Sequence, residues 1–130
     1  MAKHAGPTDG ELEILRVLWR SGPATVRDVH DELCRTKPGT GYTTVLKLLQ
    51  IMADKGLVTR DEKSKAHVYR AKAAQDQTQR QMVGDLLDRV FGGSASRLVM
   101  HALSSKKASA EEIAEIRTML DEYAREGDQK

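Results

Sequence analysis

Apolar residues in the first part of the chain recur every three or four positions, in three stretches that glycine and proline separate. This spacing predicts three amphipathic helices, because residues three and four apart lie on one face of a helix. Thr8 and Glu11 have the spacing of a capping box before the first helix, and Thr25 is placed to cap the second. The expected core positions of these two helices are Leu12, Leu15, Leu18, Trp19, Val26, Val29, His30 and Leu33.

The third helix, expected within residues 41–58, has two unlike faces. At about 100° per residue, Val45 lies at the centre of an apolar face, and Gly56 stands where a left-handed residue ends a helix. The apolar face comprises Val45, Leu48, Leu49 and Met52, with Leu46 at its margin. The opposite face is polar and mostly short-chained, and it comprises Thr43, Lys47, Gln50 and Asp54, with Thr44 and Ile51 on its shoulder.

Two short β-branched and aromatic runs follow, at residues 57–60 and 67–70. They are typical of strands, and the polar residues 61–66 between them predict a hairpin with a loop longer than a tight turn. Three helices followed by a hairpin is the element order of a winged helix-turn-helix domain. The expected fold class is therefore mainly α with a small β-hairpin.

The helical spacing returns from residue 74. One helix is expected before Gly92 and Gly93, a short one over residues 94–103, and a last one after a second capping box, formed by Ser109 and Glu112. Three amphipathic helices of this size form a weak core alone, and pairing with a second copy hides their apolar stripes. Packing of the stripes onto the N-terminal domain is the alternative.

The expected organisation is thus a winged helix-turn-helix DNA-binding domain in residues 1–73 and an α-helical homodimerisation region in residues 74–130. The residues expected in the dimer contact are Met82, Leu86, Leu87, Val90, Phe91, Ile113, Ile116 and Leu120.

The composition, with 39% hydrophobic and 31% charged residues, is that of a soluble, helix-rich protein. There is no signal-peptide pattern and no apolar run long enough to insert into a membrane, so a cytoplasmic location is expected. A single cysteine, Cys34, excludes an intramolecular disulfide and a cysteine-rich metal cage. An interchain disulfide and a redox-active thiol remain open beside the simpler interpretation, a small residue near a helix end.

The net charge of +2 is unevenly distributed. Residues 35–72 hold 9 basic residues and 3 acidic ones, which is a local excess of +6. A basic patch on a nearly neutral protein favours a polyanionic partner, although a solvated surface has the same composition.

The polar face of the third helix fits the floor of a DNA major groove. Threonine side chains approach base edges closely, and Lys47 reaches guanine acceptors or a phosphate. The backbone amides near Tyr42 and Thr43 are placed to bind a phosphate. The basic hairpin tip is placed to contact the neighbouring DNA backbone. The alternative role of its charges is to protect the edge of the sheet from pairing. The expected DNA contacts are Tyr42, Thr43, Thr44, Lys47, Gln50, Arg60, Lys63 and Lys65.

No arrangement in the chain predicts catalysis. The histidines at His4, His30, His67 and His101 are widely spaced, and the chain has no glycine-rich phosphate loop and no nucleophile elbow. We therefore expect no enzyme activity, metal or cofactor. A winged-helix module that binds only proteins is the main rival to DNA binding, but such a module normally exposes a larger apolar patch.

Three segments resemble the penicillinase-repressor (BlaI/MecI-type) family of bacterial transcription regulators: TVRDVHDEL, GYTTVLKLLQIMADKGLV and the hairpin end AHVYRA. The resemblance continues through Gly92 and Gly93 to the final helix. It implies a winged helix, a helical dimerisation region and repression at a dyad-symmetric operator. It also implies control of β-lactam resistance or envelope-stress genes, together with a membrane-bound sensor metalloprotease that triggers cleavage of the repressor.

The chain departs from this family at two places, and it also differs from the copper-responsive relatives. Well-studied relatives are cut at an Asn-Phe bond, and the corresponding cleavage region here is His101 and Ala102. Ile51 stands where relatives often carry an arginine, so one DNA contact is absent. Copper-responsive relatives carry cysteine pairs near the C-terminus, whereas this chain has no cysteine after Cys34.

Overall fold

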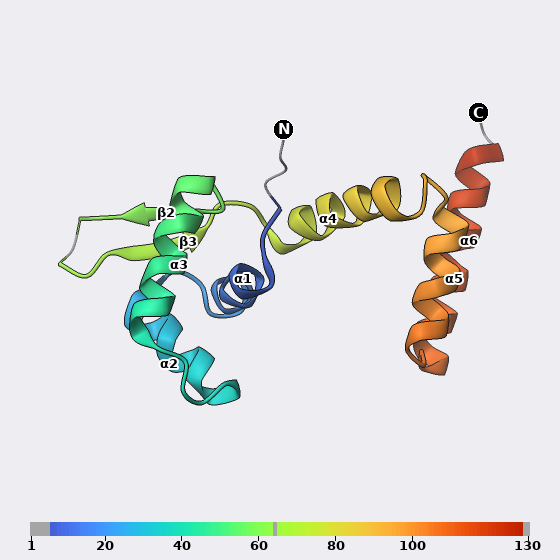
Figure 1. Cartoon of the computed structure of the whole chain (residues 1–130). Coiled ribbons are helices and arrows are strands. Elements are labelled where there is room, and N and C mark those ends of the chain that lie inside the picture. Colours follow the sequence, from blue (N-terminus) through green and yellow to red (C-terminus); the bar gives the residue numbers. More distant parts are fainter. Residues whose placement is uncertain (1–5, 64, 129–130) are drawn as a thin grey trace. The chain divides into compact units, whose positions relative to one another are not determined.

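The structure is a computed structural model that describes residues 6–63 and 65–128. Helices predominate and a small antiparallel sheet accompanies them, which confirms the expected fold class (Figure 1). The elements in chain order are α1 (Asp9–Ser21), β1 (Ala24–Thr25), α2 (Val26–Thr36), α3 (Tyr42–Lys55), β2 (Val58–Asp61), β3 (Val68–Ala71), α4 (Gln75–Val90), α5 (Ala95–Ser105) and α6 (Ala110–Asp128).

The chain divides into two compact units, the first ending at Val83 and the second beginning at Gly84. The boundary therefore falls inside α4, ten residues beyond the one expected after residue 73. The start of α4 belongs to the first unit because Thr78 is buried there and because Trp19 Nε1 donates a hydrogen bond to Ala73 O at 3.0 Å.

The helix caps follow the expected residues. Thr8 and Glu11 form a capping box, and Thr25 forms another with Asp28. Ser109 Oγ accepts from the Glu112 amide at 3.1 Å, while Glu112 Oε1 accepts from the Ser109 amide at 3.2 Å. At the other end of α3, Gly56 has a φ of 83°, a left-handed conformation that a side chain would strain.

The sheet differs from the expected two-stranded hairpin. β2 and β3 each begin and end one residue later than the runs at 57–60 and 67–70, and β1 adds a third strand in the order β1-β3-β2. β1 is short and antiparallel to β3, with Ala24 opposite Tyr69. Two residues are too few to show the alternation from which a strand is predicted.

The core of the first unit lies among α1, α2, α3 and the sheet. On α1, Ile14 and Val17 are buried although they were not expected in the core, whereas Leu12 and Trp19 are only partly buried at its edge. The reason is that α1 packs against both α2 and α3, so its buried stripe is wider than one row. His30 and Leu33 are likewise only half-buried.

Glu11, on the inner side of α1, is buried with 2% exposure. Its Oε1 accepts from Lys55 Nζ at 2.7 Å, so the pair joins the start of α1 to the end of α3. Burial raises the pKa of Glu11, but hydrogen bonds from Lys55 and Thr8 and the charge of Lys55 outweigh burial and lower the pKa below its ordinary value.

The second unit leaves many apolar side chains exposed. Val90, Met100 and Tyr123 have exposed fractions of 65%, 65% and 67%, which is high for side chains of this kind. Ser94 caps α5, and the Phe91 ring contacts the His101 ring at a centroid distance of 5.6 Å. None of the helices in the described ranges combines the length and apolarity that crossing a membrane requires.

Candidate nucleic-acid interface

The two faces of α3 are arranged as its sequence predicts. Val45, Leu49 and Met52 have no exposed surface, while Leu46 and Leu48 are half-buried against the same core. The solvent-facing residues are Tyr42, Thr43, Thr44, Lys47, Gln50, Ile51 and Asp54. The helix therefore presents threonine, lysine and glutamine side chains along one open surface, with Ile51 as its apolar member.

The N-terminus of α3 has no side-chain cap. Hydroxyl side chains accept from the first-turn amides of α1, α2, α5 and α6, whereas Gly41 before α3 makes no such bond. Unsatisfied amides and the positive end of the helix dipole attract an anion. This end of α3 is consequently suited to a phosphate.

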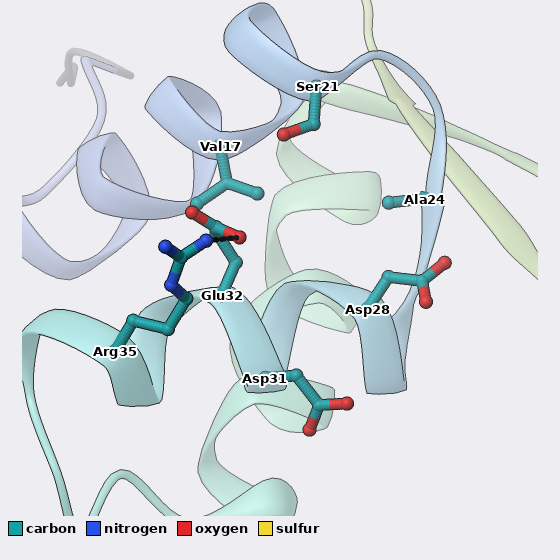
Figure 2. Close-up of a pocket in the computed structure, with 7 residues that line it drawn as sticks. All are labelled: Val17, Ser21, Ala24, Asp28, Asp31, Glu32 and Arg35. Carbon is teal, nitrogen blue, oxygen red and sulfur yellow. Dashed lines mark hydrogen bonds and ion pairs between the residues drawn. The ribbon is translucent and has the colours of Figure 1, made fainter.

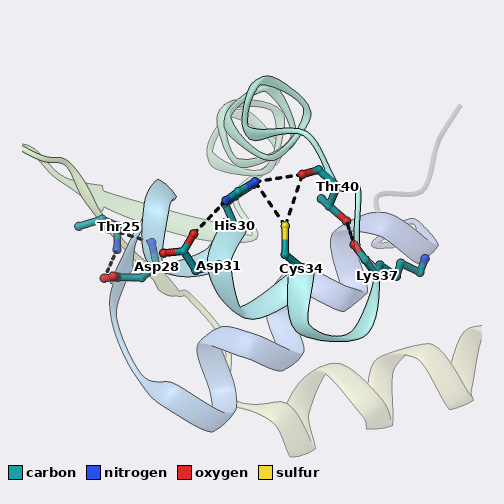
Figure 3. A network of polar contacts seen from close by, with 7 residues as sticks. All are labelled: Thr25, Asp28, His30, Asp31, Cys34, Lys37 and Thr40. Atoms are coloured by element: carbon teal, nitrogen blue, oxygen red, sulfur yellow. Dashed lines mark hydrogen bonds and ion pairs between the residues drawn. The ribbon is translucent and has the colours of Figure 1, made fainter.

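The turn before α3 is tied to α2 through the carbonyl of Thr40 (Figure 3). His30 Nε2 lies 3.0 Å from Thr40 O, and Cys34 Sγ donates to the same oxygen at 3.5 Å. A carbonyl oxygen only accepts, so His30 Nε2 carries the hydrogen. The other ring nitrogen, Nδ1, lies 3.0 Å from Asp31 Oδ1. These contacts hold the start of α3 against α2, and the sequence predicted none of them.

The hairpin of β2 and β3 carries the expected cations, but they are not equivalent. Arg60 Nε donates to Glu62 Oε2 at 2.8 Å, and hydrogen bonds with Tyr69 and then Glu62 raise the pKa of Arg60. Its charge is thus offset within the hairpin. Lys63 and Lys65 are exposed, and neither forms an ion pair with any residue in the described part of the chain. They are the free cations of the hairpin tip.

A hollow of about 270 Å³ lies between α1 and α2 (Figure 2). Its charged groups serve the fold: Glu32 pairs with Arg20 at 3.2 Å and with Arg35 at 3.4 Å, and Asp28 belongs to the Thr25 cap. The lining residues are Val17, Ser21, Ala24, Asp28, Asp31, Glu32 and Arg35. The acidic character of this surface makes it unsuited to a polyanion.

Within residues 6–63 and 65–128, no three metal-binding side chains gather in one place. His4, the remaining histidine of the sequence, lies outside those residues. His101 and Ala102, the expected cleavage region, lie on the exposed surface of α5.

The residues expected in a dimer contact are divided by exposure. Most are half-buried, whereas Leu86, Val90 and Leu120 are exposed by 42%, 65% and 58%. Met82 lies in the first unit, where it borders a hollow beside Trp19. The expected set omitted further exposed apolar residues of α4, α5 and α6, namely Val83, Val99, Met100, Leu103, Met119 and Tyr123.

Comparison with known proteins gives consistent matches. A sequence model of the family described as Penicillinase repressor matches residues 7–122. The chain is 32% identical to the transcriptional regulator BlaI of Mycobacterium tuberculosis over 124 residues, covering 94% of this chain and 88% of the relative. It is 26% identical to the penicillinase repressor of Bacillus licheniformis over 119 residues, covering 89% and 90%.

A solved structure is also similar, the DNA-binding domain of the repressor BlaI in solution. The match has a TM-score of 0.50 and 24% identity, and it covers 58% of this chain and 90% of that chain. The similarity confirms the winged-helix fold of the N-terminal part.

Proposed function

The chain belongs to the penicillinase repressor family, and on this premise we propose that it represses transcription as a homodimer bound to a dyad-symmetric operator. Membership of the family makes it a DNA-binding transcriptional repressor and not an enzyme. Each copy places Thr43, Thr44 and Lys47 in one of two successive major grooves.

One observation carries this proposal: α3 exposes a polar face and an uncapped N-terminus, while Val45, Leu49 and Met52 at the centre of its apolar face are fully buried. Small hydroxyl side chains allow the helix to approach base edges, and the free amides donate hydrogen bonds to a phosphate at the groove wall. Tyr42 and Ile51 are the exposed large hydrophobic residues of this helix, each 41% exposed, which is too little apolar surface for a protein-docking helix. Asp54 at the far end repels phosphate, so base contacts lie in the first two turns.

The hairpin tip contacts the neighbouring backbone through Lys63 and Lys65, with Arg60 contributing less because Glu62 offsets its charge. The second unit pairs with its copy through the apolar side chains that a single chain leaves exposed. The protein acts in the cytoplasm, and its targets are β-lactam resistance or envelope-stress genes. A membrane-bound sensor metalloprotease relieves repression, with the exposed α5 around His101 and Ala102 as the accessible segment.

The test begins with selection of duplexes that the protein binds from a random pool, followed by affinity measurements on a selected and an unrelated duplex. We expect Lys47→Ala to weaken binding to the selected duplex by about 1–3 kcal/mol and to reduce the preference over unrelated DNA, because Lys47 reads a base. The matched control is Lys107→Ala, which removes an exposed lysine from the second unit. Failure to enrich any sequence would contradict the proposed function, and unchanged binding by Lys47→Ala would remove Lys47 from the interface.

A further inference from the structure

Arg27, near the start of α2, lies above the aromatic ring of Tyr42, the first residue of α3. The guanidinium carbon is 5.3 Å from the centroid of that ring. His30, one turn further along α2, meets the ring edge-on, with centroids 5.8 Å apart and an interplanar angle of 61°. The Tyr42 ring is therefore in contact with both a cation and an imidazole, and 41% of the residue is exposed.

Arg27 differs from Arg20 on α1 and Arg35 on α2, because these two arginines form ion pairs. Arg20 and Arg35 both pair with Glu32, and these contacts offset their charges. Arg27 is exposed and forms no ion pair with any residue in the described ranges. An aromatic ring restrains a guanidinium without neutralising it, because the attraction comes from the ring quadrupole. Arg27 thus keeps a full positive charge in a restrained position.

The position of this charge is defined by contacts on both sides. His30 contacts Tyr42 with its ring and Thr40 O with its Nε2, so the segment from Thr40 to Tyr42 is fixed to α2 at two points. Arg27 is on the same helix and contacts the same tyrosine. The guanidinium therefore lies beside the first turn of α3. Arg27 itself belongs to α2, a helix for which the sequence predicts no DNA contact.

We propose that Arg27 binds a phosphate of the operator backbone and that Tyr42 and His30 position it for this contact. The inference rests on the proposed function, since it assumes that the first turn of α3 faces DNA. It adds a backbone contact from α2 to those of the hairpin tip. It also gives the Tyr42 ring the role of a platform for Arg27, in place of the direct DNA contact expected from the sequence. A restrained side chain loses less conformational freedom on binding than a free one does.

The salt dependence of DNA binding tests the contact. Two probes are needed, a random-sequence duplex and a duplex obtained by selection. We expect Arg27→Ala to lower the magnitude of the salt slope by about 0.9 for each chain bound, on both probes, which is about an eightfold weaker affinity per chain near 0.1 M salt. Arg27→Gln should behave in the same way, which guards against an effect of lost packing. Arg16→Ala is the control, because Arg16 is exposed on α1 and borders the hollow beside Trp19.

A wild-type salt slope in both Arg27 variants would overturn the phosphate contact. A slope lowered equally by Arg16→Ala would also overturn it, because the effect would then reflect net charge alone. If the wild-type protein enriches no DNA sequence in the selection while Arg27→Ala still lowers the slope on random duplex, the operator hypothesis fails and the phosphate contact stands. The two failures are therefore distinguishable.

A double-mutant cycle tests the platform role of Tyr42. We expect Tyr42→Leu to weaken binding about two- to tenfold in the wild type and to have no further effect in Arg27→Ala, because the ring acts through Arg27. Tyr42→Phe keeps the ring and should bind as the wild type does. An equal loss from Tyr42→Leu in both backgrounds, or a loss from Tyr42→Phe, would show that Tyr42 contacts DNA directly and would overturn its positioning role.

Discussion

At the residue scale, the ion pair of Glu11 and Lys55 is the structural feature that the sequence predicts least. The side chain of Glu11 is 3% exposed and that of Lys55 is 28% exposed. The two residues are 44 positions apart in the chain. Glu11 also closes the capping box with Thr8. The sequence predicts the capping box because it is local, whereas no local pattern reports which lysine folds back onto the same carboxylate.

This ion pair predicts sensitivity to acid. The pKa of Glu11 is lower in the folded than in the unfolded chain, so its stabilisation is complete above the ordinary carboxyl value and is lost as pH falls through the folded value. At neutral pH, Glu11→Gln should lower the free energy of unfolding by about 1–3 kcal/mol. Urea denaturation at several pH values measures the difference, which should shrink toward acid pH.

Glu13→Gln is the matched control for that measurement. Glu13 pairs with Lys37, whose side chain is 64% exposed, and an exposed pair contributes less than about 1 kcal/mol. A difference between Glu11→Gln and the wild type that does not change with pH would contradict the assigned ionisation.

At the element scale, the hairpin is the clearest test of backbone contact. Replacing Lys63 and Lys65 together by alanine should lower the magnitude of the salt slope by up to about two units for each chain bound, because each lysine neutralises one phosphate. The affinity for selected and unrelated duplexes should fall by a similar factor, since phosphates carry no sequence information.

The control for the hairpin removes two other lysines, Lys106 and Lys107, which are exposed and lie between α5 and α6. This variant has the same net charge as the hairpin variant. Equal salt slopes for the two variants would show that the hairpin tip acts only through the overall charge.

The elements differ in how far the sequence predicts them. Helix α3 is predicted with its ends and both faces, because its spacing is regular and Gly56 marks its end. Strand β1 is not predicted, because its two residues pair with β3 through contacts far apart in the chain. The same limit applies to the candidate nucleic-acid interface. The helical spacing predicts which residues of α3 are exposed, but the contacts of Arg27 and His30 with Tyr42 depend on how α2 packs against α3.

At the scale of the whole molecule, the second unit is defined by apolar surface that one chain does not bury. The helical spacing predicts these side chains, but it does not locate the boundary between the units. Contacts of Trp19 with Ala73 and the burial of Thr78 extend the first unit into α4, and neither has a local signature in the sequence.

The proposed dimer is tested by introducing charge into this surface. Leu86 is 42% exposed and Leu87 is half-buried, so replacing both by aspartate should place charges within the contact and yield monomers. Sedimentation velocity at several protein concentrations measures the outcome. Replacing Gln77 and Gln81 by aspartate adds the same charge to exposed polar positions of α4 and should leave the dimer intact. A persistent dimer of the leucine variant would place the contact elsewhere.

At the uncapped start of α3, a substitution of Gly41 is expected to have opposite effects on the stability of the fold and on DNA binding. Gly41 has a φ of −82° and a ψ of 143°, and an added Cβ would meet only Thr44 Oγ1 at 3.6 Å, so a serine fits there without strain. Its hydroxyl would satisfy an amide as Thr8 and Thr25 do in α1 and α2, which stabilises a helix by a few tenths of a kcal/mol. The same hydroxyl would compete with the DNA phosphate for that amide. Substitutions that raise the thermal stability of the protein are therefore better placed away from Gly41, because a serine at this position is expected to lower the affinity for DNA.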